Sequence, residues 1–259
     1  MIDTPEDPYV TVDRVTRAGS PVVEIVLDRP EKLNALPGDS IETLAEVFES
    51  ITTDSGAVVV LTGAGGEFCV GADVSEFDLE SEDAFAASAA GTHRLVEAIQ
   101  GCPLAVITRA NGRAFGIGFL LCMAADVVVA REDAEFGLQE VQLGLPVAGF
   151  ATTMLPRIVG DHRAREWLFT GTPVAAEEAE RSGFVTRIET AETLDDAVDE
   201  YVTQFDSNSE AAIELLKSRM EIVPPIDDVE PIRDREREDI RRAFRGGDLR
   251  ERIGEFREQ

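Results

Sequence analysis

Two glycine-bearing loops carry the residue types best suited to chemistry in this sequence. They cover residues 62–73 and 111–118, and each follows a short apolar run that is typical of a buried strand. Glycine lets the backbone approach a ligand closely, and a helix that starts after such a loop leaves its first N–H groups unpaired. Together the loops could form an oxyanion hole, which donates two hydrogen bonds to an oxygen that gains negative charge. Either loop alone is better explained as a tight connection, so the prediction depends on the pair.

Alternating strands and helices must position these loops. Residues 9–16 and 22–27 predict an antiparallel hairpin. After the hairpin, apolar residues at helical spacing alternate with short apolar runs, which predicts helices at 39–51, 82–99 and 116–124 and strands at 57–62, 104–108 and 127–130. This order indicates an α/β fold with largely parallel strands, whose carboxyl ends are the usual place for a ligand site.

The end of the chain is predicted to be helical. Strands almost vanish after residue 161, and helical segments are expected near residues 161–170, 175–182, 191–206, 208–222 and 228–257. Pro224 and Pro225 mark the clearest break, and no long linker or internal repeat separates the parts. We therefore expect an α/β core over residues 1–190 and a helical region over residues 191–259.

The chain is strongly acidic. It holds 51 Asp and Glu against 24 Lys and Arg, which gives a net charge of -27, and the acids are spread through every region. Such a surface repels itself unless salt screens it, so we interpret the composition as an adaptation to high salt. An acidic partner-binding surface would instead gather its acids on one element. Nucleic acid is excluded as a partner by the same charge.

Other features bound the class of protein further. No apolar stretch approaches the roughly 20 residues that cross a bilayer, and residues 1–8 lack a signal region, so we expect a cytoplasmic protein without a membrane segment. Cys69, Cys102 and Cys122 share no metal-ligand spacing, so neither a disulfide nor a metal site is expected. His93 and His162 lie in charged, helical sequence and are expected at the surface, outside any Ser-His-Asp arrangement.

An ordered set of motifs resembles the enoyl-CoA hydratase/isomerase family, also called the crotonase family. The set consists of Leu27-Asp28-Arg29-Pro30, Asn34-Ala35-Leu36, residues 68–73, Asn111-Gly112, Gly116, Asp126, Phe136-Gly137 and residues 140–144. No single motif is decisive, but their order and spacing are typical of the family. The match runs from about residue 22 to residue 185 without large gaps.

The resemblance implies a spiral of ββα units with a helical C-terminal trimerisation region, assembled as a homotrimer or a dimer of trimers. It also implies an acyl-CoA thioester substrate whose carbonyl lies between two backbone N–H groups, and the matching donors are those of Ala72 and Ile117. Ile117 stands where relatives usually have glycine, so it narrows the acyl pocket unless its side chain points away. No cofactor or metal is expected, because coenzyme A is part of the substrate.

One departure from the family pattern bears on the reaction. Hydratases of this family typically use two glutamates to handle a water molecule and its protons. In this chain the first position falls on Leu120 and the second on Glu140. A single carboxylate suits the transfer of one proton between two carbons of the same substrate, and the segment around Glu140 is similar to the mitochondrial-type 3,2-enoyl-CoA isomerase.

We therefore expect a 3-enoyl-CoA to 2-enoyl-CoA isomerase with Glu140 as its base. The first alternative is a 2-enoyl-CoA hydratase of fatty-acid or amino-acid breakdown, with Asp73 or Glu76 as the second acid. Decarboxylation and thioester hydrolysis are also known in the family, and a non-catalytic CoA-ester-binding trimer is the alternative of another class. Without the resemblance, Glu140 would be interpreted as an ordinary solvated acid.

The resemblance also implies residues that contact the substrate: Lys32, Leu33, Ala35, Gly71, Asp73, Val74 and Gly116. Asp73 is expected to shape its loop rather than to react, and Arg29 to meet a phosphate or to pair with an acid. The C-terminal helices are expected to cover the CoA site as well as to assemble the oligomer. Their many arginines are expected chiefly to form ion pairs within a helix at the oligomer surface.

Overall fold

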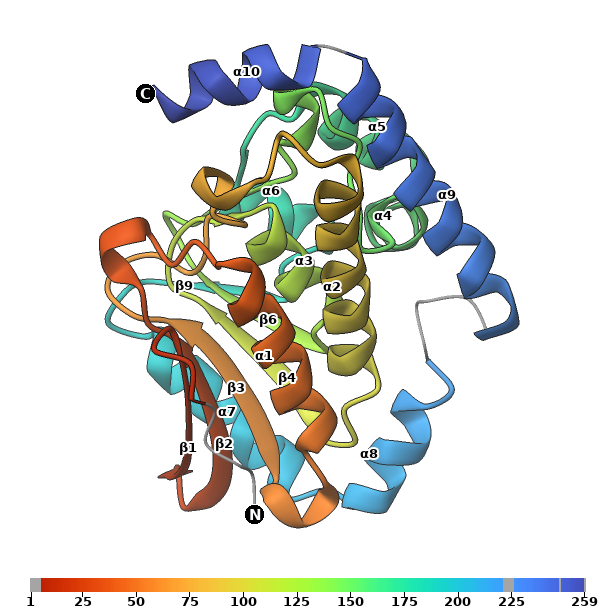
Figure 1. Ribbon diagram of the computed structural model, residues 1–259. Helices are drawn as coiled ribbons and strands as arrows, with labels where there is room; N and C mark the ends of the chain where they lie inside the picture. The colour runs from red at the N-terminus through yellow and green to blue at the C-terminus, as the bar shows by residue number, and fades with distance from the viewer. Residues whose placement is uncertain (1–5, 221–225, 247, 259) are drawn as a thin grey trace.

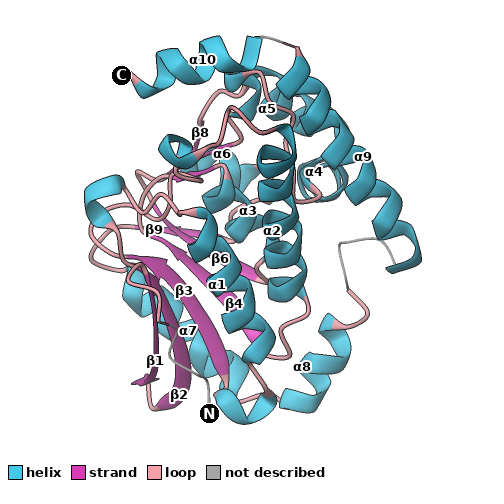
Figure 2. Cartoon of the chain, in the orientation of Figure 1, coloured by secondary structure: helices cyan, strands magenta, loops and turns pink. Residues whose placement is uncertain are grey.

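Six strands form the main sheet of the chain (Figure 1, Figure 2). The computed structural model describes residues 6–220, 226–246 and 248–258. The strands lie in the order β1 (Val10–Arg17), β2 (Ser20–Leu27), β3 (Val58–Gly63), β4 (Ala105–Ala110), β6 (Val127–Arg131) and β9 (Arg187–Glu189). The hairpin of β1 and β2 is antiparallel, and every pair from β2 to β9 is parallel, which confirms the predicted α/β fold.

Helices cover both faces of this sheet (Figure 1). On one face lie α1 (Gly38–Ser50), α2 (Glu82–Gln100) and α3 (Ile117–Ala124), and on the other lies α7 (Leu194–Asp206). In β3 the side chains alternate: Val59 and Leu61 join the larger core under α1 and α2, whereas Val58 and Val60 pack toward α7. A strand buried on both faces explains why its sequence is a continuous apolar run.

Several short elements were not predicted from the sequence. A second sheet contains β5 (Ala114–Phe115), β7 (Glu135–Gly137) and β8 (Val174–Ala175). The helix α4 (Ala151–Val159) was missed as well, and it precedes α5 (Asp161–Thr170) and α6 (Ala176–Arg181). Strands of two or three residues are too short to show a period, so pattern alone could not find them.

The helical C-terminal region follows α7. Helix α8 (Glu210–Lys217) leaves Leu215 and Leu216 exposed, and Met220 just beyond it is exposed too. The predicted break at Pro224 and Pro225 lies outside the described residues. The predicted helix at 228–257 is two helices, α9 (Ile226–Arg245) and α10 (Asp248–Arg257).

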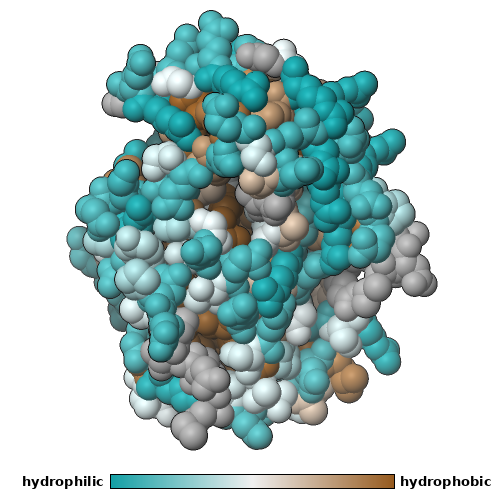
Figure 3. Space-filling model, viewed as in Figure 1, coloured by the Kyte–Doolittle hydropathy of each residue, from teal (hydrophilic) through white to brown (hydrophobic). Residues whose placement is uncertain are grey.

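The last two helices return to the core. Helix α9 packs along α2, and α10 crosses over the loops that follow β3 and β7 (Figure 1). A third apolar cluster joins Phe85, Ala86 and Ala89 of α2 to Ile240, Phe244, Leu249 and Ile253 of the last two helices. The surface on the face shown in Figure 3 is mostly hydrophilic, and apolar residues are visible chiefly in the recesses between helices and strands. The C-terminal region is therefore fixed to the core by apolar packing.

Candidate active site

Three loops meet at the carboxyl edge of the sheet. They follow β2, β3 and β4, which are adjacent and parallel, so their carboxyl ends lie side by side. Single β-bridges join the loops to one another, between Leu36 and Ala72 and between Cys69 and Ala114. The N–H of Gly116 donates to the carbonyl of Gly137 at 2.9 Å, which attaches the segment containing Glu140. The sheet thus brings the two predicted glycine loops together.

Two backbone N–H groups in these loops have no hydrogen-bond partner within the described part of the chain. The N–H of Ala72 and the N–H of Ile117 donate to no acceptor among the residues that the structure describes. The loops are in contact, because a side chain at Gly71 would begin 3.4 Å from the Phe115 carbonyl oxygen and 3.9 Å from the Ile117 nitrogen. Ile117 is also the first residue of α3, whose dipole favours negative charge at that end. Two such donors are the requirement for an oxyanion hole.

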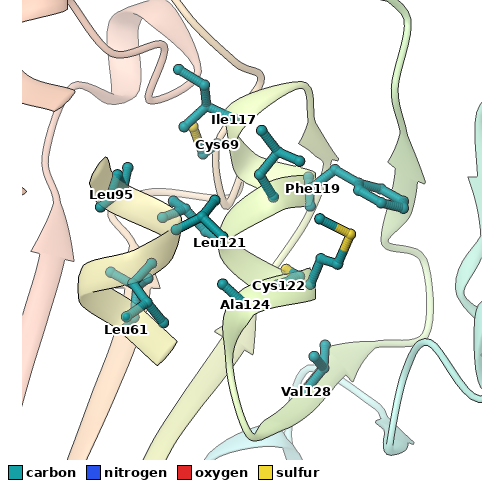
Figure 4. Close-up of a cluster of buried hydrophobic side chains, with 14 of the residues drawn as sticks. Leu61, Cys69, Leu95, Ile117, Phe119, Leu121, Cys122, Ala124 and Val128 are labelled. Atoms are coloured by element: carbon teal, nitrogen blue, oxygen red, sulfur yellow. The ribbon is translucent and has the colours of Figure 1, made fainter. Parts of the chain in front are cut away.

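The side chain of Ile117 packs in the hydrophobic core. It is 6% exposed, and Figure 4 shows it beside Cys69, among the side chains of α3 and the strands below. Gly118, the next residue, is held against Cys69: a side chain there would begin 2.1 Å from the Cys69 carbonyl oxygen. Isoleucine at position 117 therefore leaves its own N–H available, because only the backbone of this position is needed.

Glu140 lies against the second loop. It opens the short helix η4 (Glu140–Leu143), and its Oε1 is 3.4 Å from the point where a side chain at Gly116 would begin. Its Oε2 is buried and has no hydrogen-bond partner among the described residues. Burial raises the pKa of Glu140 to about 7, and a hydrogen bond from its own backbone acts in the opposite direction. A carboxyl group with such a pKa can both take and return a proton near neutral pH.

Leu120 occupies an apolar space where the resemblance would place a first glutamate. Its side chain is 3% exposed. A side chain at Gly149 would begin 2.8 Å from Cδ1 of Leu120 and 3.1 Å from Cγ2 of Thr92, so this part of the molecule is closely packed. A charged group would cost free energy here, because the apolar side chains around it could not replace the water that solvates a charge.

The two alternative acids stand in different surroundings, and Asp73 is already engaged by other residues. Asp73 accepts hydrogen bonds from Ser75 and forms an ion pair with Arg29, whose Nη1 lies 2.8 Å from Oδ2 of Asp73. Burial acts to raise the pKa of Asp73, but the bonds from Ser75 and Arg29 outweigh it and lower that pKa. Glu76 is exposed on η3 (Val74–Glu76). Asp73 therefore shapes its loop, and Arg29 is its partner.

The other expected substrate contacts lie around the same loops. Lys32 and Leu33 are exposed at the end of η1 (Pro30–Lys32). The backbone of Ala35 is already engaged, because its N–H donates to the Lys32 carbonyl and its carbonyl accepts from Arg29. Gly71 and Gly116 face each other at van der Waals distance, and the carbonyl of Val74 is bound by a C-terminal arginine.

The expectation for the C-terminal arginines was incomplete. Some form ion pairs within α9, such as Arg233 with Glu230, but others pair with acids of α2 or bind loop carbonyls. In α10, Arg252 donates to the carbonyl of Gln142, while Arg250 and Arg257 donate to carbonyls of residues 74–79. Helix α10 is thus tied to η4 and to the segment that begins with η3. Sequence spacing could not show this, because the acceptors are backbone groups far away in the chain.

The expectation that His93 lies at the surface was wrong. His93 is 3% exposed, and its Nε2 lies 2.6 Å from Oε2 of Glu236 in α9, which is itself buried. Its Nδ1 lies 2.7 Å from the carbonyl oxygen of Ala89, which can only accept, so Nδ1 carries a hydrogen. Glu236 also accepts from the N–H of Phe150. His162 is exposed, as expected.

The described residues lack the features of two other classes of protein. None of their helices is long and apolar enough to cross a membrane. Within the same residues, no cluster of three or more His, Cys, Asp or Glu side chains has an arrangement that could hold a metal ion.

Comparison with known proteins places this arrangement in a family. The chain is 35% identical to the carnitinyl-CoA dehydratase of Proteus mirabilis over 208 residues, which are 78% of this chain and 77% of that protein. It is 32% identical to the short-chain-enoyl-CoA hydratase of Clostridium acetobutylicum over 199 residues, 76% of each.

Solved structures of this family have the same fold as this chain. A crystal structure of an enoyl-CoA hydratase from Mycobacterium avium subsp. paratuberculosis superimposes with a TM-score of 0.84 at 26% identity, covering 96% of this chain and 99% of that one. The family model described as enoyl-CoA hydratase/isomerase matches residues 17–258. The chain therefore belongs to the enoyl-CoA hydratase/isomerase family.

Proposed function

We propose that this protein is a 3-enoyl-CoA to 2-enoyl-CoA isomerase with Glu140 as its single acid–base residue. The observation that carries the proposal is the contrast between two positions. Glu140 has a buried, unpartnered carboxyl oxygen and lies against Gly116, the residue before the unpaired N–H of Ile117, whereas Leu120 fills an apolar space where a hydratase of the family would have its first glutamate. One carboxyl group is enough for an isomerase, because it can return the proton that it removes.

The proposed reaction proceeds in two steps. The thioester carbonyl oxygen accepts hydrogen bonds from the N–H groups of Ala72 and Ile117, and the Glu140 carboxylate removes a proton from C2. The electron pair of the broken C–H bond delocalises into a dienolate, whose oxygen the two N–H groups stabilise; each such donor is worth about 3 kcal/mol in the barrier. Glu140, now protonated, delivers the same proton to C4, and the double bond lies between C2 and C3.

The rate should depend on pH through Glu140. Its pKa is raised to about 7, and only the carboxylate can remove the C2 proton. We expect kcat/KM to fall about tenfold for each pH unit below 7 and to reach a plateau above pH 8. Initial rates between pH 5.5 and 8.5 at constant salt measure this. A profile that is flat across this range would contradict the assignment of Glu140 as the base.

The activity itself is tested with two substrates side by side. Conversion of 3-hexenoyl-CoA to its conjugated 2-enoyl isomer is expected, with hydration of crotonyl-CoA slow or absent. Rapid hydration without isomerisation would favour the alternative that the names of the relatives suggest, a 2-enoyl-CoA hydratase. Tight binding of both thioesters without turnover would instead favour a non-catalytic CoA-ester-binding protein.

Lys32 is proposed to contact the phosphates of coenzyme A. It is exposed on the loop that follows β2, it forms no ion pair with a described residue, and the only other lysine is Lys217. We expect Lys32→Ala to raise KM for an acyl-CoA about fivefold with little change in kcat, since a direct charge contact is lost. Lys217→Ala is the matched control. Lys217 lies on helix α8 and pairs with Asp126, away from the loop that follows β2. Equal KM values for the two variants would contradict the proposal.

We also propose that the protein is a homotrimer or a dimer of trimers that works at high salt, with residues 191–259 both assembling the oligomer and covering the CoA site. The charge of -27 and the exposed apolar side chains of α8 support this. Light scattering in molar KCl measures the assembly, and a monomer at micromolar concentration would contradict it.

A further inference from the structure

Arg29 is the most deeply buried arginine near the candidate active site. It is 9% exposed, and its Nη1 lies 3.0 Å from the carbonyl oxygen of Ala35 and 2.8 Å from Oδ2 of Asp73. Its guanidinium carbon lies 4.7 Å above the centre of the Tyr9 ring. The guanidinium therefore joins the loop after β2 to the loop after β3, in surroundings that strengthen charged hydrogen bonds.

The same two loops are joined by backbone bonds on both sides of Ala72. The N–H of Leu36 donates to the carbonyl of Gly71, and the N–H of Asp73 donates to the carbonyl of Leu36, both at 2.9 Å. Successive peptide groups of an extended chain point in alternate directions. The carbonyl of Gly71 and the N–H of Ala72 belong to the same trans peptide group and point in opposite directions. Because that carbonyl points toward Leu36, the N–H of Ala72 points away from it, and the bridge fixes the direction of this donor.

Asp73 is held from two directions at once. Its backbone N–H is fixed on Leu36, and its carboxylate is fixed by Arg29 and by the N–H and hydroxyl of Ser75. Arg29 in turn is fixed on Ala35, one residue before Leu36. The ion pair therefore closes a ring of contacts whose other side is the bridge at Ala72.

We propose that Arg29 is a positioning residue for the oxyanion hole: through Asp73 and Ala35 it holds the peptide of Ala72 in the direction that lets its N–H bind the thioester oxygen. This inference rests on the proposed function, since it assigns a role within the same site. Removing the ion pair lets this peptide rotate, which weakens one of two donors. We expect Arg29→Met to lower kcat about tenfold or more, with KM changed much less.

The decisive measurement reports on the carbonyl rather than on turnover. Butyryl-CoA labelled with carbon-13 at the thioester carbonyl has no double bond to isomerise, so it forms a stable complex with the protein. Difference infrared spectroscopy of the complex measures the carbonyl stretch, and hydrogen bonds from an oxyanion hole move it to lower wavenumber. We expect a clear shift with the wild-type protein, an equal shift with Glu140→Gln, and less than half of it with Arg29→Met.

Three further variants complete the design. Asp73→Asn removes the charge but preserves the shape of the side chain, so it tests the same ion pair even if Arg29→Met does not fold, and the double variant should lose no more than either single one. Arg29→Lys keeps the charge and should recover part of the shift. Arg17→Met is the control, because Arg17 is also a partly buried arginine paired with acids, Asp195 and Asp199, but lies away from the site. Its shift should equal that of the wild type.

The outcomes separate this inference from the proposed function. A full shift in both Arg29→Met and Asp73→Asn would overturn the role of Arg29 and leave the oxyanion hole standing. No shift in the wild-type complex would overturn the oxyanion hole and this inference together. A shift that is lost in these variants would support the inference even if 3-hexenoyl-CoA proved not to be the substrate.

Discussion

Glu140→Gln should abolish isomerisation and at the same time make the folded protein more stable above pH 7. Glutamine cannot remove the C2 proton, so we expect kcat to fall by about three orders of magnitude or more, within the range for loss of a positioned acid–base group. Binding of butyryl-CoA should change little, because the two N–H groups and the CoA contacts remain. A residue that only filled space would not combine these effects.

The expected gain in stability follows from the pKa of Glu140. Burial raises it from an ordinary 4.5 to about 7, so the folded state binds this proton more tightly than the unfolded chain does. Stability from the protonated form is therefore lost as pH rises from 4.5 through 7, and above pH 7 the fold must hold a carboxylate with a buried, unpartnered oxygen. The full cost is about 3 kcal/mol at 1.36 kcal/mol per pKa unit, and neutral glutamine avoids it.

Unfolding by urea at fixed molar KCl measures this effect. The free energy of unfolding of Glu140→Gln minus that of the wild type should increase by about 2 kcal/mol between pH 5.5 and pH 8. Glu132→Gln, which changes an exposed acid in the turn between β6 and β7, should show no such pH-dependent difference. If Glu140→Gln stayed active, or if its stability relative to the wild type did not depend on pH, Glu140 would not be the buried base.

The parts of the site that could be predicted are those encoded by local sequence. The strand runs before Gly63 and Asn111 are apolar and rich in β-branched residues, so parallel neighbours and a shared carboxyl edge followed from pattern alone. The two glycine loops could be predicted without knowing which residues they contact, because glycine itself allows the close backbone contacts that Gly71 and Gly118 make. Glu140 was different: its position became meaningful only through the resemblance to the family.

The parts that could not be predicted depend on partners far apart in the sequence. Arg29 meets Asp73 through the adjacent ends of β2 and β3, and His93 meets Glu236 only because α9 returns to α2. His93 stands next to the charged Arg94, but Ala89 and Val96, four residues before it and three after it, are apolar and buried, so helical spacing does place His93 on the apolar face of α2. The arginines of α10 bind carbonyl oxygens, which every residue has and no pattern can reveal.

Loss of the buried pair between His93 and Glu236 should produce the largest stability effect outside the core. Nδ1 of His93 bonds the carbonyl oxygen of Ala89, and Nε2 lies 2.6 Å from Oε2 of Glu236. Glu236→Ala removes the hydrogen-bond partner of Nε2 and the acceptor for the N–H of Phe150, leaving buried polar groups unsatisfied. We expect a loss of roughly 3–5 kcal/mol in the free energy of unfolding.

A double-mutant cycle separates the pair from its individual members. His93→Leu together with Glu236→Leu replaces both polar groups by apolar ones, and it should recover at least about 2 kcal/mol of the sum of the single losses. Glu238→Ala is the matched control on the same helix: its carboxylate is exposed and lies 3.5 Å from Arg245, so the loss of stability should be small.

Because α9 leads directly into α10, Glu236→Ala should also loosen the contacts of α10 with η3 and η4, which hydrogen exchange at residues 248–257 would report. Additive single losses, or protection at α10 equal to that of the wild type, would show that this pair does not secure the C-terminal helices over the site.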